Sequence, residues 1–362
     1  MASFETLTWH TNQQPYQSYV PDMMLEKPIR TSQRLRDALE QLNRFAISSD
    51  HKAFFNRYLS GNVSLREGTG VTHKQLALCS AGIPTKDSIV RQLWSQMYKF
   101  QLGCDYATKL FEGNGMWQIP TLLELHCCLA PEAPNSGQLR MTTCWIGGKC
   151  PTKARFVAAS PQRLESLMED WLSFVNEKAQ IGLENILLAY DQFLVVHPFS
   201  DGNGRVSRVF MESALNHLRQ GYWLHPLFFR LANSAANYIH AHNAYQRDEL
   251  EPWLAYWEDA FEWLVEKQKQ IKEILRQCEL QVDRALLCSE KPPLWDELKA
   301  QLYKTPIINM EVAHQYTQSV TLMIQSGVLQ VKHVSEMNNM TVLECPSVFE
   351  MWQKWEESLL VS

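Results

Sequence analysis

The chain has 362 residues, of which 45% are hydrophobic and 20% are charged, and its net charge is −5 at pH 7. This length suits two or three domains with a buried core. The charge gives no electrostatic reason to expect nucleic acid or an anionic membrane as the main partner. Nine cysteines without a CxxC pair favour a reducing compartment. With no signal peptide and no apolar span of about twenty residues evident, we expect a cytoplasmic protein.

Apolar residues recur with helical spacing along most of the chain, which predicts a mainly α fold. The helix expected over residues 184–196 is apolar on most sides, as is typical of a helix at the centre of a core. His126 stands beside Cys127 and Cys128 without the spacing of metal ligands, and we expect it in the core. In chain order, the predicted helices cover residues 31–45, 87–102, 119–129, 160–175, 184–196, 205–218 and 251–279.

Two parts of the chain depart from this helical pattern. Residues 140–146 and 154–157 are short and β-prone, and a Gly/Lys/Pro turn separates them, which predicts a small hairpin. After Lys291-Pro292-Pro293, two short helices precede β-prone runs at 328–334 and 340–344, with a turn at Asn338-Asn339 between the runs. Two helices followed by a hairpin are typical of a winged helix.

A winged helix raises the alternative of a DNA-binding regulator. From Lys291 to the end, however, the chain has eight acidic residues, five lysines and no arginine. The expected recognition helix at 316–326 has no basic residue at all, and phosphate contacts need Lys or Arg. We therefore interpret the tail as a module that binds protein or supports a homodimer.

The densest chemistry lies in residues 197–208, HPFSDGNGRVSR. Pro198 disfavours the helical conformation in the residue before it, so the preceding helix is expected to end near His197. Residues 200–204 tolerate positive φ and can turn successive N–H groups into a concave anion nest. The helix that follows adds the positive end of its dipole.

Charged side chains complete this pattern. Arg205 and Arg208 are three residues apart and leave one helix face, where both can clamp phosphate. Asp201 is the one carboxylate of the loop and suits Mg²⁺, which binds through few carboxylates plus substrate phosphates. Each feature alone also fits a simple turn or a core residue. Their convergence within twelve residues predicts a polyphosphate site.

This run resembles the signature of the Fic family, HPFx[DN]GNGRxxR, at every defined position. Trp145-Ile146-Gly147 with residues 154–157 is similar to the family's flap. Asn237-Tyr238 and the later Glu251-Pro252-Trp253 are similar to its C-terminal core. The resemblance implies a Fic-type helical bundle with a β-hairpin flap. We accordingly predict an N-terminal helical region (1–95), a Fic catalytic core (96–285) and a winged helix (290–362), as in two-domain bacterial members.

The resemblance also implies an activity, the transfer of AMP from ATP to a Ser, Thr or Tyr hydroxyl of a target protein. His197 would be the general base, and Asp201 would hold Mg²⁺. The target would add a strand to the flap at 145–157. The resemblance further implies that phosphates meet Gly202, Asn203, Gly204 and Arg205, that the γ-phosphate meets Arg208, and that Tyr238 forms a wall of the adenine pocket or is simply a core tyrosine.

Related two-domain members carry an inhibitory helix with the pattern [ST]xxxE[GN]. Near residues 60–70, Glu67-Gly68 fits its end, but Val63 stands where Ser or Thr is expected, and Ser64 is three residues before Glu67. By this resemblance, Glu67 would pair with Arg208 and displace the γ-phosphate. Glu67 on a solvated surface is the alternative. The same carboxylate could instead activate water and remove AMP, so the direction of the reaction stays open.

Overall fold

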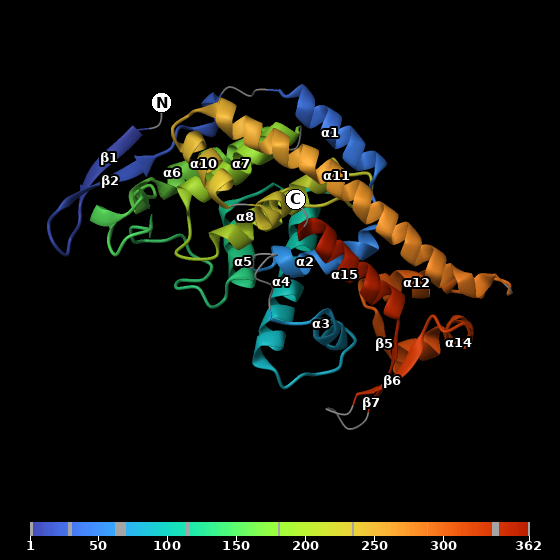
Figure 1. The fold of residues 1–362 in the computed structure, drawn as a ribbon. Helices are drawn as coiled ribbons and strands as arrows, with labels where there is room; N and C mark the ends of the chain where they lie inside the picture. The colour runs from blue at the N-terminus through green and yellow to red at the C-terminus, as the bar shows by residue number, and fades with distance from the viewer. Residues whose placement is uncertain are drawn as a thin grey trace. The chain divides into compact units, whose positions relative to one another are not determined.

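The computed structural model describes residues 3–27, 31–61, 70–112, 116–179, 182–233, 235–287, 289–334 and 340–360. Helices dominate them, and the strands form small antiparallel sheets (Figure 1). No described helix is long and apolar enough to cross a membrane. The predicted mainly α fold is confirmed. Two compact units divide the chain: Met1–Asp37, Lys99–Arg219 and Ser234–Ala260 form the first, and Ala38–Tyr98, Gln220–Asn233 and Phe261–Ser362 form the second.

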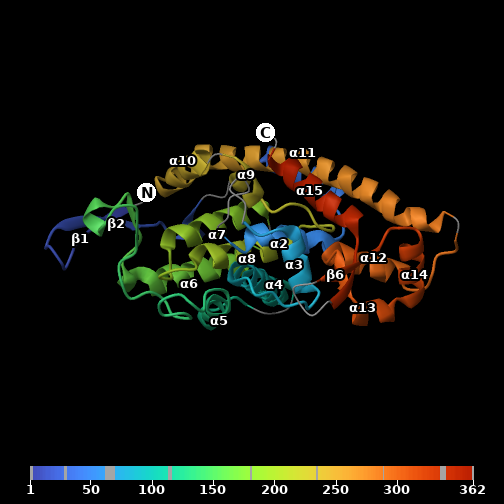
Figure 2. The ribbon, with the colours of Figure 1, turned by 60° about the horizontal axis from the view of Figure 1, so that its bottom comes forward.

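Helix α7 (Leu183–Val196) is the central helix of the first unit. Every side chain of α7 except that of Leu194 is buried, as its apolar sequence predicts. Around it pack α6 (Leu164–Phe174), α8 (Asn203–Asn216) and α10 (Ala235–Gln246), and α5 (Ile119–Leu129) packs on α8 (Figure 2). The unit also contains the later part of α4 (Ser88–Glu112) and the start of α11 (Leu250–Asp283).

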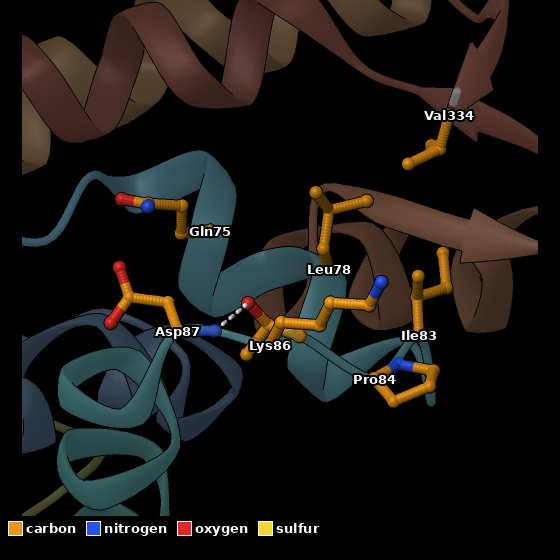
Figure 3. Close-up of a pocket in the computed structure, with 8 residues that line it drawn as sticks. Gln75, Leu78, Ile83, Pro84, Lys86, Asp87 and Val334 are labelled. Carbon is orange, nitrogen blue, oxygen red and sulfur yellow. Dashed lines mark hydrogen bonds between the residues drawn. The ribbon is translucent and has the colours of Figure 1, made fainter. Parts of the chain in front are cut away.

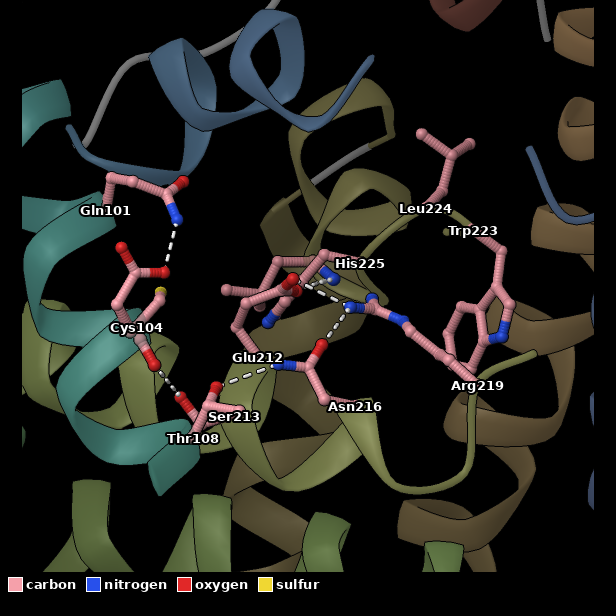
Figure 4. A network of polar contacts seen from close by, with 12 residues as sticks. Gln101, Cys104, Thr108, Glu212, Ser213, Asn216, Arg219, Trp223, Leu224 and His225 are labelled. Carbon is pink, nitrogen blue, oxygen red and sulfur yellow. Dashed lines mark hydrogen bonds and ion pairs between the residues drawn. The ribbon is translucent and has the colours of Figure 1, made fainter. Parts of the chain in front are cut away.

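A buried polar network holds the C-terminal end of α8 (Figure 4). The Arg219 guanidinium donates to the carboxylate of Glu212 at 2.7 Å, and both side chains are almost fully buried. Asn216 accepts a weaker bond from Arg219 at 3.4 Å and donates to Thr108 on α4 at 2.9 Å. These bonds join α8 to α4, so they also fix the helix that follows the motif loop.

Two β-hairpins pack on each other at one end of the first unit. The predicted flap is present as β3 (Trp145–Ile146) and β4 (Phe156–Val157), with shorter strands than the sequence suggested. The other hairpin, β1 (Ser3–Thr8) and β2 (Pro15–Val20), was not predicted, because the N-terminal region was expected to be helical. Its Ser18 hydroxyl donates to the Ala158 carbonyl at 2.9 Å, which joins the hairpin to the flap.

The second unit has an aromatic core. Phe55 on α2 (Lys52–Leu59) stacks on Trp355 of α15 (Pro346–Leu360), with ring centroids 5.3 Å apart. The indole N–H of Trp355 donates to the Ile271 carbonyl on α11 at 3.0 Å. The C-terminal helix is therefore part of this core.

The tail contains the elements that the sequence predicted, in the predicted order. Helices α13 (Met310–Gln315) and α14 (Thr317–Gln325) precede the hairpin of β6 (Gln330–Val334) and β7 (Met340–Glu344). A further strand, β5 (Ile307–Asn309), pairs with β7, so the sheet order is β5-β7-β6. The predicted turn at Asn338-Asn339 lies outside the described residues. The winged-helix assignment stays a prediction.

A hollow of about 540 Å³ opens in the second unit beside this sheet (Figure 3). The hollow is lined by residues from three segments: Gln75 and Leu78 of α3 (His73–Ser80), Lys86 from the loop after α3, and Val334 of β6. None of the predicted site residues lines this hollow, and the motif at residues 197–208 lies in the first unit.

The remaining elements are short or connect these bundles. They are α1 (Gln33–Arg44), α9 (Leu227–Ala232), α12 (Trp295–Lys304), the 3-10 helices η1 (Met24–Glu26), η2 (Ser49–His51), η3 (Pro151–Lys153), η4 (Pro161–Arg163) and η6 (Arg284–Leu286), and the π-helical η5 (Val175–Ala179).

Candidate active site

Helix α7 ends at His197, where the sequence predicted its end. The backbone of His197 is left-handed, with φ 54° and ψ 59°, and its N–H closes the helix by donating to the Phe193 carbonyl. Among non-glycine residues this conformation is uncommon and marks a position that the surrounding structure must hold. The sequence had assigned positive φ only to residues 200–204, and of these the structure gives it to Gly202.

The imidazole of His197 is oriented by a backbone carbonyl. Its Nδ1 lies 3.2 Å from the Leu194 carbonyl oxygen, so Nδ1 carries the proton and Nε2 is left as the acceptor nitrogen. Burial lowers the pKa of His197 below 6.5, and the charges of Arg140 and His242 lower it further, against the opposing effects of the hydrogen bond to the Leu194 carbonyl and of Asp201. The ring is therefore neutral at pH 7 and able to accept a proton.

The loop after His197 is closed by Asn203. Its side-chain oxygen accepts from the Phe199 N–H at 2.9 Å, and its amide nitrogen donates to the Phe199 carbonyl at 2.8 Å. This pair of bonds forms a ring across the turn, so the Asn203 side chain shapes the loop. The predicted contact of Asn203 with phosphate stays a prediction. Because the side chain bonds to Phe199, the group of Asn203 that remains for phosphate is its backbone N–H in the first turn of α8.

His126 supports the loop from α5. Its ring stacks on Phe199 with centroids 3.8 Å apart. Its Nδ1 accepts from the Gly137 N–H, so Nε2 carries the proton and donates to the Asp201 carbonyl at 2.9 Å. The expected core position of His126 is confirmed by its complete burial. Its part in shaping the loop could not be read from the sequence, because its loop partners lie 73 to 75 positions away.

Gly202 begins α8 at a tightly packed point. Its φ is 82°, and an added Cβ would lie 2.7 Å from the Ala130 side chain and 3.0 Å from Nε2 of His126. No side chain caps the first turn of α8 within the described part of the chain. The first amides of a helix point outward along its axis, so this turn offers N–H groups and a positive dipole end to an anion.

Asp201 and Arg205 lie at the same end of α8. Asp201 is 63% exposed, and its carboxylate accepts from the Gly202 N–H at 2.6 Å and from Arg205 at 3.2 Å. Arg205 also donates to Glu132 and to the Leu129 carbonyl. One exposed carboxylate fits a Mg²⁺ ion that brings water and phosphate as its other ligands. No cluster of three metal-ligating side chains was found among the described residues.

Arg208 leaves α8 one turn further along and is 7% exposed. Its guanidinium passes close to Gly204, where an added Cβ would lie 3.2 Å from Nη1. Gly204 therefore leaves room for this side chain. Glu67, the predicted inhibitory partner of Arg208, lies outside the described residues.

Tyr238 is buried on α10. Its ring is nearly parallel to that of His242, with centroids 6.0 Å apart, and meets Tyr256 edge-on at 5.8 Å. His242 in turn approaches the buried Asp191 on α7 at 3.2 Å. Tyr238 is thus part of a packed cluster, and its predicted contact with adenine stays a prediction.

No motif in the sequence includes Arg140, which the structure places behind His197. Its side chain is only 2% exposed, and its donors reach the carbonyls of His197 at 2.7 Å and Ala159 at 2.6 Å. Burial lowers the pKa of Arg140 to about 10, so it keeps its charge at neutral pH. An isolated arginine outside any motif could be recognised only once the fold brought it beside the loop.

Residues 118–215 match the model of the Fic/DOC family. The chain contains a Fic domain. The motif loop, His197, Asp201 and both arginines fall inside this domain, and the flap hairpin does as well. The resemblance noted in the sequence is thereby confirmed at the level of the family.

Curated relatives match the Fic domain and parts of the chain around it. The protein adenylyltransferase fic-1 of Caenorhabditis briggsae is 30% identical over 142 residues, which are 38% of this chain and 26% of that protein. The protein adenylyltransferase Fic of Drosophila willistoni is 25% identical over 206 residues, 53% of this chain and 40% of that protein. The chain thus spans less than half the length of these relatives.

A solved Fic family protein from Desulfovibrio desulfuricans resembles the chain with a TM-score of 0.50 and 14% identity. The match covers 88% of this chain and 98% of that one. At this identity the likeness shows the fold alone. The Fic-type helical fold that the sequence predicted is confirmed.

Proposed function

We propose that this chain is a protein adenylyltransferase that transfers AMP from ATP to a Ser, Thr or Tyr hydroxyl of a target protein. One observation carries the proposal: a neutral imidazole with Nε2 as its acceptor nitrogen stands at the loop that leads into an uncapped helix start flanked by Asp201 and Arg205. A base beside an anion site is what nucleotidyl transfer to a hydroxyl needs.

The chemistry follows from these groups. Nε2 of His197 takes the proton of the target hydroxyl, and the hydroxyl oxygen forms a bond to the α-phosphorus of ATP. The bond from the α-phosphorus to the oxygen bridging to the β-phosphate breaks, and pyrophosphate leaves. The first N–H groups of α8 and the Arg205 guanidinium neutralise charge on the phosphates. Mg²⁺ bound to Asp201 would supply further charge neutralisation. Arg208 meets the γ-phosphate.

The target protein would bind along the flap at residues 145–157 as an added strand. The described structure adds a second wall to this surface. Between the N-terminal hairpin and the approach to the flap lies a hollow of about 590 Å³, lined by Trp9, Tyr16, Met141 and Trp145 among others. Trp9 and Trp145 pack edge to face at 5.7 Å. A side chain of the target next to the modified hydroxyl would fit this hollow, whose lining also includes polar residues such as Thr142 and Ser160.

We further propose that Glu67 restrains the reaction by pairing with Arg208, since an arginine held by a carboxylate is not available to phosphate. Removal of AMP by water that Glu67 activates is the alternative reaction at the same site. For the tail, a protein partner or a second copy of the chain suits its acidic charge better than DNA. We expect the enzyme in the cytoplasm.

The test uses α-labelled ATP with Mg²⁺, incubated with the protein alone and with a cell lysate. We expect label on the chain or on a lysate protein, and a loss of at least about 100-fold in rate for His197→Ala, the usual contribution of a general base. Equal labelling by His197→Ala would rule out His197 as the base. Labelling with four nucleotides of different base would establish the donor.

Glu67→Gly tests the inhibitory proposal in the same assay. We expect this variant to label itself faster than the wild type, because Arg208 is released for the γ-phosphate. Glu356→Gly is not a suitable control, because Glu356 accepts a hydrogen bond from the buried Tyr58 hydroxyl and pairs with the half-buried His73. The exposed Glu266 is suitable, and Glu266→Gly should leave the rate unchanged. Equal rates for wild type and Glu67→Gly would remove the inhibitory role.

A further inference from the structure

Arg140 donates hydrogen bonds only to the backbone among the described residues. Its guanidinium reaches four carbonyl oxygens: Nε to His197 at 2.7 Å, Nη2 to Ala159 at 2.6 Å and to Val196 at 3.3 Å, and Nη1 to Thr142 at 3.1 Å. Its own N–H donates to the Pro198 carbonyl at 2.9 Å. A buried arginine used in this way, without a carboxylate partner in the described part of the chain, is unusual, because buried charges are ordinarily paired with an opposite charge.

Two of these bonds fix the backbone of His197. The Val196 carbonyl belongs to the peptide plane before the His197 Cα atom, and the His197 carbonyl belongs to the plane after it. The angle between the two planes is set by φ and ψ of His197. Because one rigid planar guanidinium bonds to both carbonyls, it holds His197 in its left-handed conformation. These carbonyls also end α7, where a cation is favoured by the helix dipole.

The other two bonds reach the stems of the flap. Thr142 lies just before β3, and Ala159 lies just after β4. The same guanidinium therefore joins both stems of the flap to the end of α7. Since the flap is the surface proposed for the target backbone, the spacing between the target hydroxyl and Nε2 of His197 depends on this one group.

We infer that Arg140 is a positioning residue: it fixes the orientation of the His197 imidazole relative to the flap, so that a hydroxyl held by the flap meets Nε2. This inference rests on the proposed function for its kinetic consequences. Its structural part, the control of His197 by Arg140, holds for the chain whatever reaction it performs.

Lysine cannot replace Arg140 in this role. Its ammonium is a point charge with three donors, whereas the bonds to Val196, His197, Thr142 and Ala159 use the planar fork of a guanidinium. Arg140→Lys keeps the charge and loses the geometry, and Arg140→Gln loses both. The two variants thus separate charge from orientation. Arg163→Gln is the matched control, because Arg163 is exposed and bonds to Glu5 near the base of the same flap.

The first experiment measures labelling kinetics. We expect Arg140→Lys and Arg140→Gln to lower kcat by about 100-fold, as misplacement of a reacting group by about 1 Å can do. The KM for ATP should change less than about twofold, because the phosphate side of the site is not bonded to Arg140. Arg163→Gln should match the wild type. A folded Arg140→Lys with wild-type kcat would overturn the inference, as would equal losses in kcat and in ATP binding.

The second experiment does not need activity. Histidine labelled with ¹³C is followed by NMR against pH, and the His197 signal is assigned by its absence in His197→Ala. The charged or titratable groups around His197 are Arg140, His242 and Asp201. We expect the pKa of His197 to rise in Arg140→Gln, to stay lower in Arg140→Lys, and the Nδ1–H tautomer to lose its dominance in both.

An unchanged tautomer and pKa in both variants would overturn the inference, and so would a failure of both variants to fold, which would make Arg140 merely structural. Circular dichroism decides whether they fold. A wild type that gives no label with any nucleotide would instead remove the proposed function, while the NMR result would still decide the role of Arg140.

Discussion

At the scale of single residues, the site depends on two backbone conformations of positive φ, one at His197 and one at Gly202. The sequence anticipated the glycine, because Asp-Gly-Asn-Gly is typical of tight turns. It also predicted His197 as the base, and that role stays a prediction. It could not anticipate that His197 itself is left-handed, because the bonds that hold it come from Arg140, 57 positions earlier. A residue that acts through distant carbonyls leaves no local pattern.

Gly202→Ala should destabilise the protein and abolish labelling. Two costs add at this position: the left-handed backbone, about 1 to 2 kcal/mol, and the clash of Cβ with Ala130 and His126, about 1 to 3 kcal/mol. Gly327→Ala is the matched control, since Gly327 has φ 74° and open space where Cβ would lie. Chemical denaturation measures both variants. Equal losses of stability in the two variants would show that the contact of Cβ with Ala130 and His126 adds no cost at Gly202.

The rate of labelling should decline as the pH falls and should reach half its plateau value at a pH below 6.5. Burial and the charge of Arg140 hold the pKa of His197 below its ordinary value of 6.5, so more than half of the imidazole is still neutral at pH 6.5. Protonation at lower pH removes the acceptor pair on Nε2. The initial rate measured between pH 5 and 8 tests this. A half-maximal rate at pH 6.5 or above would contradict it.

At the scale of elements, local pattern predicted α5, α7 and β7 almost residue by residue, because each is a run of apolar residues with clear boundary signals. Pro120 marks the start of α5, and Pro198 marks the end of α7. The N-terminal hairpin escaped prediction. Its strand β1 is mostly exposed, so the sequence of β1 lacks a buried face. The partner strand β2 pairs with β1 and packs on the flap. Tertiary contact, and not local preference, forms this element.

Arg219→Met should lower the free energy of unfolding by about 3 kcal/mol. The change removes the ion pair of Arg219 from Glu212, whose side chain is fully buried on α8, and losing one partner of a buried pair costs about this much. Because α8 begins at the motif loop, labelling should fall as the helix end loosens. Arg276→Met is the control, since its ion pair with Glu273 is exposed and should contribute little. Similar effects of both substitutions would contradict the prediction.

At the scale of the whole molecule, the two units interleave along the chain. Each unit takes three segments, and the division falls inside α1, α4 and α11. The sequence predicted consecutive domains over 1–95, 96–285 and 290–362, because a change of composition such as Lys291-Pro292-Pro293 is the local signal of a boundary. Composition cannot reveal that α15, beyond the last strand, packs with α2 from near the start of the chain. The three predicted domain boundaries therefore stay a prediction. The contact between α2 and α15 shows only that the tail packs with an earlier helix inside the second unit.

Trp355→Ala tests whether the tail belongs to the core of the second unit. Trp355 is fully buried, stacks on Phe55 and bonds to the Ile271 carbonyl, so its removal leaves a large cavity at the junction of α2, α11 and α15. The expected loss is about 3 to 5 kcal/mol in the free energy of unfolding. Lys354→Ala, one position earlier on the exposed face of the same helix, should unfold like the wild type. Denaturation followed by circular dichroism compares them. If Trp355→Ala unfolds like Lys354→Ala, the tail is an independent module, and the aromatic contacts between α2 and α15 contribute nothing to stability.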